Sequence, residues 1–486
     1  MEPLIMWGYI VLVVYLIILL VIGYISSKKA KLNVEQHYLG GRSMPAIVVA
    51  ITFVTASTSA GAFMGEPGLG YSVGMPSLWT SITIIPGLIF ATLIFSKKLH
   101  AFSVVTNSVT IPSYLGKRYD SNVLRVALAV VLVLFYGVTM VGLFKGAAIL
   151  FNAVMGIPMN TALIVFGIIV AIYVSFGGFR AIAWTDVVQS VPMVLFSLIL
   201  ITYSFLKVGG LSGLGERLAD IDPSLTNMFE PTLYSPLGVI GLYVFWMIVF
   251  SSNPYLSTKF MALKDSRKKT MRTFLITVLI FTAILNLNFI IGLAARPLLP
   301  NLGEPDFATI EMAILLLPPI IAAILMIGIL SAVLSTIDAI LLVIGTSVGE
   351  DIYKHSINPN ATDQQVINVT RIAIVLVTFV VVIFSLWKTP DLLALLMYVG
   401  LSGVGIAIAP SLLTGLFWRK ASKTGALASL FIAVPFYGYI NMATSINPYV
   451  GILYGTVVAF GIMIVVSAFT KPPNDQVVGQ FMKKAS

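Results

Sequence analysis

Two polar stretches interrupt apolar segments of this chain and carry the residue types best suited to chemistry. The first is Thr55-Ala-Ser-Thr-Ser-Ala-Gly61, with Gly65, Pro67 and Gly68 after it, and the second is Ser251-Ser-Asn-Pro254. A broken helix frees backbone carbonyl and amide groups that can bind a cation or the polar end of a solute. Inside a membrane, such backbone is tolerated only where it lines a cavity or is buried in protein. The alternative is that the small residues only permit close helix packing.

Three charged residues in or near the apolar segments, Lys145, Asp338 and Glu66, are candidates for a function. A lysine near the centre of a membrane helix costs about 2.5–3.5 kcal/mol, so Lys145 is expected to have a partner or a function. Its expected partner is Asp338 or a solute carboxylate, and an internal cation that replaces or tunes a bound ion is an alternative. Alternatively, the ammonium of Lys145 snorkels towards the outer headgroups. The alternative for Asp338 is a water-facing position in the inward vestibule. Glu66, before Pro67, is expected to lie at the outer mouth and to end its helix.

The segments that must position these residues are apolar runs of about 20 residues, long enough to cross a bilayer as helices. Of the residues, 58% are hydrophobic and 10% are charged, and the mean hydropathy is +1.00. This is more apolar surface than a soluble core could bury. The chain is therefore predicted to be an all-α polytopic membrane protein. About thirteen helices are expected, centred near residues 15, 56, 85, 138, 168, 195, 247, 284, 328, 376, 403, 432 and 459.

The two interruptions lie five helices apart, which predicts a five-plus-five repeat of opposite topology with discontinuous helices. A single integral membrane transporter domain over residues 1–486 is expected. Its predicted parts are a peripheral first helix (5–26), a first repeat (44–205), an inverted second repeat (236–418), two peripheral helices (422–470) and a cytoplasmic tail (471–486).

Clusters of Lys and Arg predict the orientation in a cell membrane. With thirteen helices they all fall on one side, which is then the cytoplasm. The opposite loops, 207–235 and 297–306, are rich in acids, so the N-terminus is expected outside and the C-terminus inside. The net charge of +10 therefore indicates topology and no nucleic-acid partner. The clusters are Lys28, Lys29 and Lys31; Lys97, Lys98, Lys117 and Arg118; Lys259 through Arg272; Arg419, Lys420 and Lys423; and Lys471, Lys483 and Lys484.

Several function classes are disfavoured. There are no cysteines, and the three histidines lie in polar connectors, so disulfides and a zinc site are not expected. No Ser-His pair or His/Asp/Glu cluster falls inside an apolar segment, which argues against an enzyme. A passive channel would need polar rings along its pore, whereas the polar groups here concentrate at one depth. The chain ends soon after the last helix, which argues against a sensory protein with a signalling domain.

Three segments carry a family resemblance. They are Tyr38-Leu-Gly-Gly-Arg-Ser43, Ser175-Phe-Gly-Gly-Phe-Arg-Ala-Ile-Ala-Trp-Thr-Asp-Val-Val-Gln189 and Ser331-Ala-Val-Leu-Ser-Thr-Ile-Asp338. They closely resemble the sodium/solute symporter family, especially its sodium/proline and sodium/pantothenate members, over about residues 5–470. The resemblance implies a thirteen-helix, inverted-repeat transporter that carries an organic solute inward with sodium.

Sodium prefers oxygen ligands, and the second and ninth helices supply both carbonyls and hydroxyls. By similarity to the family's core sodium site, the carbonyls would come from Thr55, Thr58 and Ala332, and the side-chain oxygens from Ser335 and Thr336. The alternative is that the two hydroxyls only bond back to carbonyls one turn earlier in their own helix.

The resemblance makes Asp186 part of the ion's exit route or of a second cation site. The alternative is that Asp186 only caps a helix N-terminus. The sodium/proline proteins carry an aspartate where this chain has Ser57, so a role that depends on that aspartate does not transfer.

The solute is expected at the second interruption, where the sequence from Trp246 to Pro254 resembles that of the proline carriers. Aromatic walls could enclose the apolar part of a small solute while freed backbone groups orient its polar end. Ordinary aromatic packing is the alternative. The predicted solute-binding residues are Ser59, Ala60, Lys145, Trp246, Phe250, Asn253 and Pro254.

The sequence therefore predicts a secondary active symporter in which sodium is the co-transported ion. The solute would be small and carboxylate-bearing, similar to proline, pantothenate or a monocarboxylate. The nearest alternative is a proton-coupled transporter of the same fold that uses Lys145 or Asp338. The oligomeric state is left open.

Overall fold

The computed structural model describes residues 2–28, 33–387 and 393–473, and within these ranges it is almost entirely helical. The predicted basic residues Lys29, Lys31, Lys483 and Lys484, and the predicted tail from residue 474 on, lie outside these ranges. The long helices are α1 (Glu2–Lys28), α2 (Val34–Leu39), α3 (Ala46–Ser57), α4 (Glu66–Val73), α5 (Leu78–Phe90), α6 (Ser96–Val105), α7 (Ile111–Arg118), α8 (Asn122–Met155), α9 (Met159–Val208), α10 (Gly210–Ile221), α11 (Pro236–Ser252), α12 (Pro254–Ala262), α13 (Lys268–Leu285), α14 (Phe289–Leu298), α15 (Ala308–Leu316), α16 (Pro319–Thr346), α17 (Asp363–Ser385), α18 (Leu393–Phe417), α19 (Lys423–Ala443) and α20 (Pro448–Phe469). Shorter helical turns are η1 (Gly40–Arg42), η2 (Gly61–Gly65), η3 (Met75–Ser77), η4 (Ala91–Phe95), η5 (Pro223–Thr226), η6 (Asn286–Asn288), η7 (Pro305–Phe307) and η8 (Ser347–Ile357).

The apolar runs form helices because only a helix satisfies every backbone polar group within its own segment in lipid. In the described part of the chain, ten helices are long and apolar enough to cross a membrane, or up to twelve if each of two bent pairs is one span. The shorter apolar helix Met159–Ile172 precedes a kink in α9 at Gly178, whose φ is 64°. The all-α polytopic prediction is confirmed, while the count of thirteen stays a prediction.

Both predicted interruptions are present as breaks between consecutive helices. Between α3 and the segment Gly61–Val73 the axis bends by 57°, and between α11 and α12 it bends by 43°. At the first break Thr58 has an extended backbone (φ −99°, ψ 92°), and at the second Asn253 does (φ −68°, ψ 120°). Pro254 has no N–H to continue the hydrogen-bond ladder of α11, which explains the second break.

Glu66 does not end its helix, contrary to the sequence expectation. The π-helical turn η2 runs directly into α4, and Glu66 is the first residue of α4. Pro67 is the second residue of α4, directly after the π-helical turn η2. The side chain of Glu66 is only 5% exposed. It lies inside the protein and not at an open mouth.

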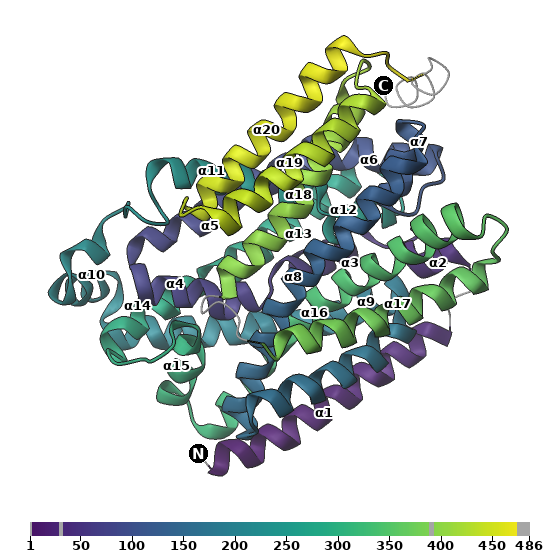
Figure 1. Ribbon diagram of the computed structural model, residues 1–486. Helices are drawn as coiled ribbons and strands as arrows, with labels where there is room; N and C mark the ends of the chain where they lie inside the picture. The colour runs from purple at the N-terminus through teal and green to yellow at the C-terminus, as the bar shows by residue number, and fades with distance from the viewer. Residues whose placement is uncertain (1, 29–32, 388–392, 474–486) are drawn as a thin grey trace.

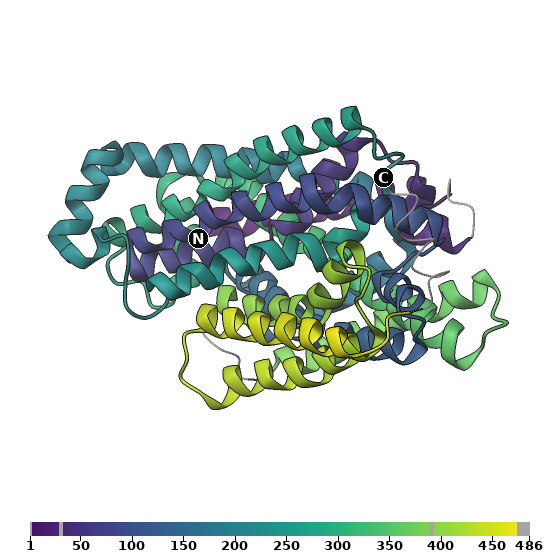
Figure 2. The same ribbon diagram turned by 90° about the horizontal axis from the view of Figure 1, so that it is seen from above.

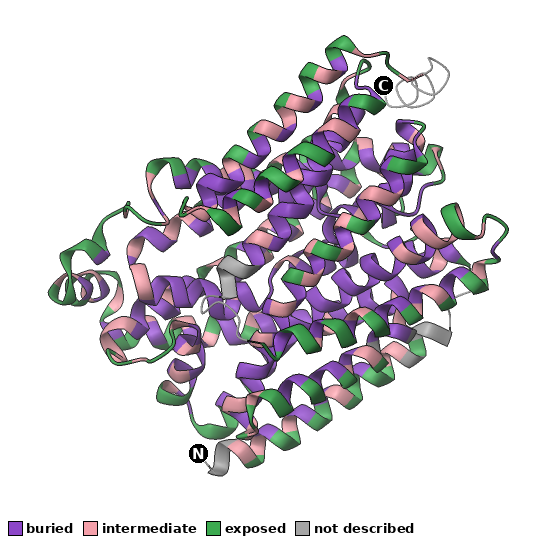
Figure 3. Ribbon diagram, in the orientation of Figure 1, coloured by how far each residue is buried: buried purple, intermediate pink, exposed green. Residues whose placement is uncertain are grey.

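Helix α16 lies in the centre of the bundle and packs against α9, α1, α8 and α3. Figure 3 shows buried residues concentrated along the middle of the bundle and exposed ones on its outer helices. In Figure 1, α1 and α20 lie at opposite edges. Seen from above in Figure 2, the yellow and light-green helices α18, α19 and α20 form a group that packs on α11 and α8. The predicted repeats, 44–205 and 236–418, each contain one of the two breaks, and their boundaries stay a prediction.

Candidate functional site

The break after α3 meets the hydroxyl pair of α16. The Ser335 hydroxyl is 2.9 Å from the Thr55 carbonyl oxygen, and the Thr336 hydroxyl is 2.9 Å from the Ala56 carbonyl oxygen. Each hydroxyl is also 3.1 Å from the Ala332 carbonyl oxygen in its own helix. Five oxygen atoms from two helices therefore lie together at a buried point. Four of the six predicted sodium-binding residues, Thr55, Ala332, Ser335 and Thr336, are brought together here.

Two details of this oxygen cluster differ from the sequence expectation. The hydroxyls contact their own helix, as the alternative interpretation held, but they also reach a second helix, which that interpretation did not include. The Ala56 carbonyl was not predicted, because a backbone oxygen leaves no mark in the residue type. The predicted ligand Thr58 is buried and caps α3, with its backbone N–H 2.9 Å from the Val54 carbonyl oxygen.

Asp186 lies beside a buried lysine. The Nζ atom of Lys259, on α12, is 3.8 Å from the Oδ2 atom of Asp186, on α9, and these side chains are 2% and 0% exposed. Thr52, on α3, bridges the pair: its hydroxyl donates to Asp186, and its oxygen lies 3.0 Å from Lys259 Nζ. Asp186 follows the kink at Gly178 by more than two helical turns, so it does not cap a helix. That alternative is wrong.

Lys259 was predicted to belong to the cytoplasmic basic cluster, and this assignment is wrong. Its ammonium lies between three helices, and its charge also interacts with that of Asp338 on α16. Lys264, five residues later, is exposed, so the exposed part of this basic cluster begins after α12. The signal for the buried position was weak, because a lysine that heads a run of basic residues resembles the others in the run.

Two small neighbouring cavities, of about 30 and 20 Å³, lie beside the break after α3. Ser57, Ala62, Glu66 and Trp246 line both of them. The first is completed by Thr58, Ile84, Phe250, Thr282, Leu285 and Asn286, and the second by Ser59, Gly61, Tyr255, Thr336, Met397, Tyr398 and Leu401. The cavities therefore lie between the first break, two residues that flank the second break (Phe250 and Tyr255), and Thr336 of α16.

The predicted aromatic wall is present. The rings of Trp246 and Phe250 stack with centroids 5.3 Å apart and an interplanar angle of 20°. Phe250 also packs on Phe53, 5.8 Å away, so it serves the core as well as the cavity. Of the other predicted solute residues, Ser59 lines a cavity, whereas Ala60 is buried without lining either.

Asn253 and Lys145 occupy other positions. The Asn253 side chain accepts a hydrogen bond from the Tyr136 hydroxyl (3.2 Å) and donates to the Leu401 carbonyl (3.1 Å). It thus ties the second break, with Pro254, to α8 and α18. Lys145 is half-buried on α8 and is not among the residues that line the two cavities in the described structure.

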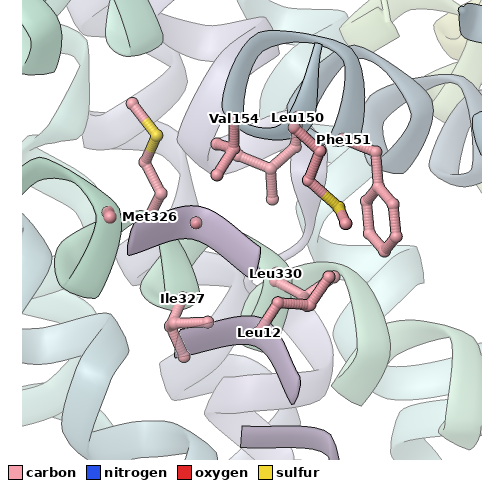
Figure 4. A pocket seen from close by; sticks show the side chains of 10 residues that line it. Leu12, Leu150, Phe151, Val154, Met326, Ile327 and Leu330 are labelled. Carbon is pink, nitrogen blue, oxygen red and sulfur yellow. The ribbon is translucent and has the colours of Figure 1, made fainter. Parts of the chain in front are cut away.

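A further cavity, of about 20 Å³, lies between α1, α8 and α16 (Figure 4). Its labelled side chains, which include Leu12, Phe151 and Met326, are all apolar. It offers no side-chain hydrogen bond to a polar solute and is therefore not the solute site.

Comparison with known proteins places this geometry in a family. The model of the sodium:solute symporter family matches residues 37–433. The chain is 30% identical over 477 residues to the high-affinity proline transporter PutP of Bacillus subtilis (strain 168), covering 95% of this chain and 98% of that protein. It is also 30% identical over 423 residues to the sodium/pantothenate symporter of Haemophilus influenzae, covering 86% of each.

A solved structure shares the fold. The substrate-bound, outward-open structure of a sodium-coupled sialic acid symporter matches 96% of this chain and 98% of its own, with a TM-score of 0.81 at 19% identity. The family model spans both helix breaks, the hydroxyl pair and Asp186, and it confirms the resemblance seen in the three sequence segments. Sodium-coupled uptake of a small solute, and not enzymatic catalysis, is the activity that this evidence supports. The chain belongs to the sodium:solute symporter family.

Proposed function

We propose that the solute is a small carboxylate-bearing molecule, and that it binds at the two cavities while sodium binds among the oxygens of Thr55, Ala56, Ala332, Ser335 and Thr336. In this arrangement the hydroxyls of Ser335 and Thr336 keep their hydrogens but rotate them away from the Thr55 and Ala56 carbonyls, so that the hydroxyl and carbonyl oxygens face the sodium ion. The N-terminus lies outside the cell and the C-terminus in the cytoplasm, in line with the basic clusters.

One observation supports this proposal most strongly: Thr336 belongs to both sites. Its hydroxyl contacts the Ala56 carbonyl of the α3 break, and the same residue lines the cavity that contains Trp246. A cation that holds α3 against α16 therefore also fixes the cavity wall formed by Ser57 and Ser59. Binding of the ion would then favour binding of the solute, and by thermodynamic linkage the reverse.

The ion gradient is sufficient for uphill uptake. One positive charge that moves inward across about 150 mV contributes roughly 3.4 kcal/mol. A tenfold sodium gradient adds about 1.4 kcal/mol. Together they allow a neutral solute to accumulate by about three orders of magnitude.

The test is counterflow in proteoliposomes loaded with members of a panel of small carboxylates, with and without sodium on both sides. We expect exchange of labelled solute only when sodium is present. Exchange that is equally fast without sodium would contradict the proposal.

A proton-coupled transporter is the second candidate, because the carboxylic acid Asp338 is fully buried on α16, two residues after Thr336. Its carboxylate, or the ammonium of Lys145, would then carry the proton. This candidate predicts that uptake follows a pH gradient when sodium is absent.

We expect Trp246→Ala and Phe250→Ala to weaken solute binding roughly tenfold or more, because each removes a large apolar surface from the cavity wall. Sodium binding measured without solute should change much less. The matched control is Trp79→Ala, which removes a stacked ring pair with Phe229 outside the cavities. Equal losses of solute and sodium binding in the cavity variants would mean that these rings only maintain the fold.

Lys145→Met tests whether its ammonium pairs with the carboxylate of the solute. Methionine keeps much of the length and loses the charge, so pairing with the solute would show as loss of carboxylate transport with sodium affinity nearly unchanged. An internal cation near the ion site would instead alter the sodium or pH dependence first. Uptake at the wild-type rate, with both dependences unchanged, would leave snorkelling as the role of Lys145.

A further inference from the structure

The two solute cavities are lined by a single ionisable side chain with a formal charge, Glu66. The described residues around them include no lysine, arginine or histidine. Glu66 lines both cavities, and its Oε2 atom is buried without a hydrogen-bond partner among the described residues. A buried carboxylate is costly unless a donor or a positive charge satisfies it. An ionised Glu66 opposes a solute that carries only a negative charge.

The same cavities also contain a hydrogen-bond donor without an acceptor in the described structure. The indole Nε1 of Trp246 is buried and has no acceptor among the described residues. Trp246 lines both cavities together with Glu66. The cavity walls therefore offer one acceptor and one donor, each unsatisfied by the protein. A solute that carries both a donor and an acceptor satisfies both.

The aromatic residues around Glu66 favour a cation as well. The faces of Trp246 and Phe250 are stacked, and Tyr398 meets Trp246 edge to face with centroids 6.2 Å apart. Tyr255 also lines the second cavity. Ring faces attract a positive charge through their quadrupole, and the attraction is stronger where water is excluded. The carboxylate and the rings thus select for the same chemical group.

We infer that the solute is a zwitterion whose positively charged nitrogen carries hydrogen, with the N–H group donated to Glu66 among the aromatic rings and the acceptor end facing Trp246 Nε1. This inference rests on the proposed function and narrows it. Among carboxylate-bearing solutes it selects amino acids, and it excludes simple monocarboxylates and hydroxylated acids without a basic nitrogen. A nitrogen that is fully alkylated keeps its charge but cannot satisfy the Glu66 oxygen, so it binds less tightly.

The test compares matched solutes as competitors of counterflow in proteoliposomes with sodium. One set shares a five-membered ring: proline, its N,N-dimethyl betaine, and cyclopentanecarboxylate. Two open-chain pairs, alanine with propionate and serine with lactate, extend it. We expect at least one N–H-bearing member to compete at least tenfold better than its counterpart without nitrogen, and the betaine to fall between them.

Glu66→Gln then tests the assigned residue, and Glu304→Gln is the control with the same charge change at an exposed loop position. The Glu66→Gln substitution should weaken binding of the N–H-bearing solute at least tenfold and leave the sodium affinity, measured with ²²Na⁺ in the absence of solute, within about twofold. Retained sodium binding shows that the variant is folded. Because the solute panel is also run on the wild-type protein, the inference does not depend on that variant.

The outcomes separate the inference from the proposed function. Sodium-dependent counterflow in which cyclopentanecarboxylate or propionate competes as well as its amino counterpart overturns the inference and leaves sodium-coupled uptake intact. The inference is also overturned, with sodium-coupled uptake intact, if Glu66→Gln changes the sodium affinity but not the preference for N–H-bearing solutes. If no N–H-bearing solute binds in sodium, the inference is wrong. Counterflow that is equally fast without sodium contradicts the proposed function whatever the preference.

Discussion

Lys259→Met is expected to abolish transport and to destabilise the protein by about 3–5 kcal/mol, because it leaves Asp186 as a buried charge without its counter-ion. The two side chains are 2% and 0% exposed, so water does not replace the lost ammonium. The ion pair joins α12 to α9, and Thr52 joins both to α3 one turn before the break. The variant therefore loosens the contact between both broken helices and their surroundings.

The measurement is the midpoint of thermal unfolding in detergent, followed by the fluorescence of the six tryptophans. Lys264→Met removes a charge at an exposed position of the same segment and should leave the midpoint unchanged. Adding Asp186→Asn to Lys259→Met removes both charges and should recover most of the stability. If Lys259→Met unfolds at the same temperature as Lys264→Met, the buried pair does not form.

The variant with both Ser335→Ala and Thr336→Ala should raise the sodium concentration for half-maximal uptake at least tenfold. It removes two of the five oxygens that converge at the α3 break, and a hard cation depends on the number of its oxygen ligands. The maximal uptake rate at saturating sodium should fall less, because the three carbonyls remain.

Thr346→Ala is the control for this double variant. Thr346 is buried on the same helix, but its hydroxyl bonds to the Val343 carbonyl of α16 and not to α3. It should leave the sodium dependence within about twofold of the wild type. An unchanged sodium dependence in the Ser335→Ala/Thr336→Ala variant would remove this oxygen cluster from the mechanism.

The positions of the two breaks could be predicted from the sequence because their residue types cause them. Pro254 cannot donate a backbone hydrogen bond, and the run of Ser, Thr and Gly after Val54 offers local hydrogen bonds that compete with the helix. The hydroxyl pair was assigned through the family resemblance of the segment from Ser331 to Asp338. What the sequence could not give is which backbone oxygens they meet, and Ala56 was missed for that reason.

The ion pair between Asp186 and Lys259 could not be predicted from the sequence. Asp186 and Lys259 are 73 positions apart in the sequence. Neither the hydrophobic periodicity nor the composition of their helices indicates that they meet. The short helix α12 determines which lysine is buried: Lys259 lies on this helix and points inward, whereas Lys264 follows its end and is exposed. Glu66 was misjudged because Pro67 suggested a helix end, whereas α4 continues directly from η2 with Pro67 as its second residue.

The measurement that most directly tests the account is solute accumulation in proteoliposomes under one imposed gradient at a time, with the solute found by counterflow. With an inward sodium gradient at uniform pH, we predict accumulation above the outside concentration, and loss of that accumulation when the sodium gradient is collapsed. With equal sodium on both sides and an inward proton gradient, at zero membrane potential, we predict none. Accumulation driven by the proton gradient, or none with the sodium gradient, would contradict sodium coupling at the oxygens of α3 and α16.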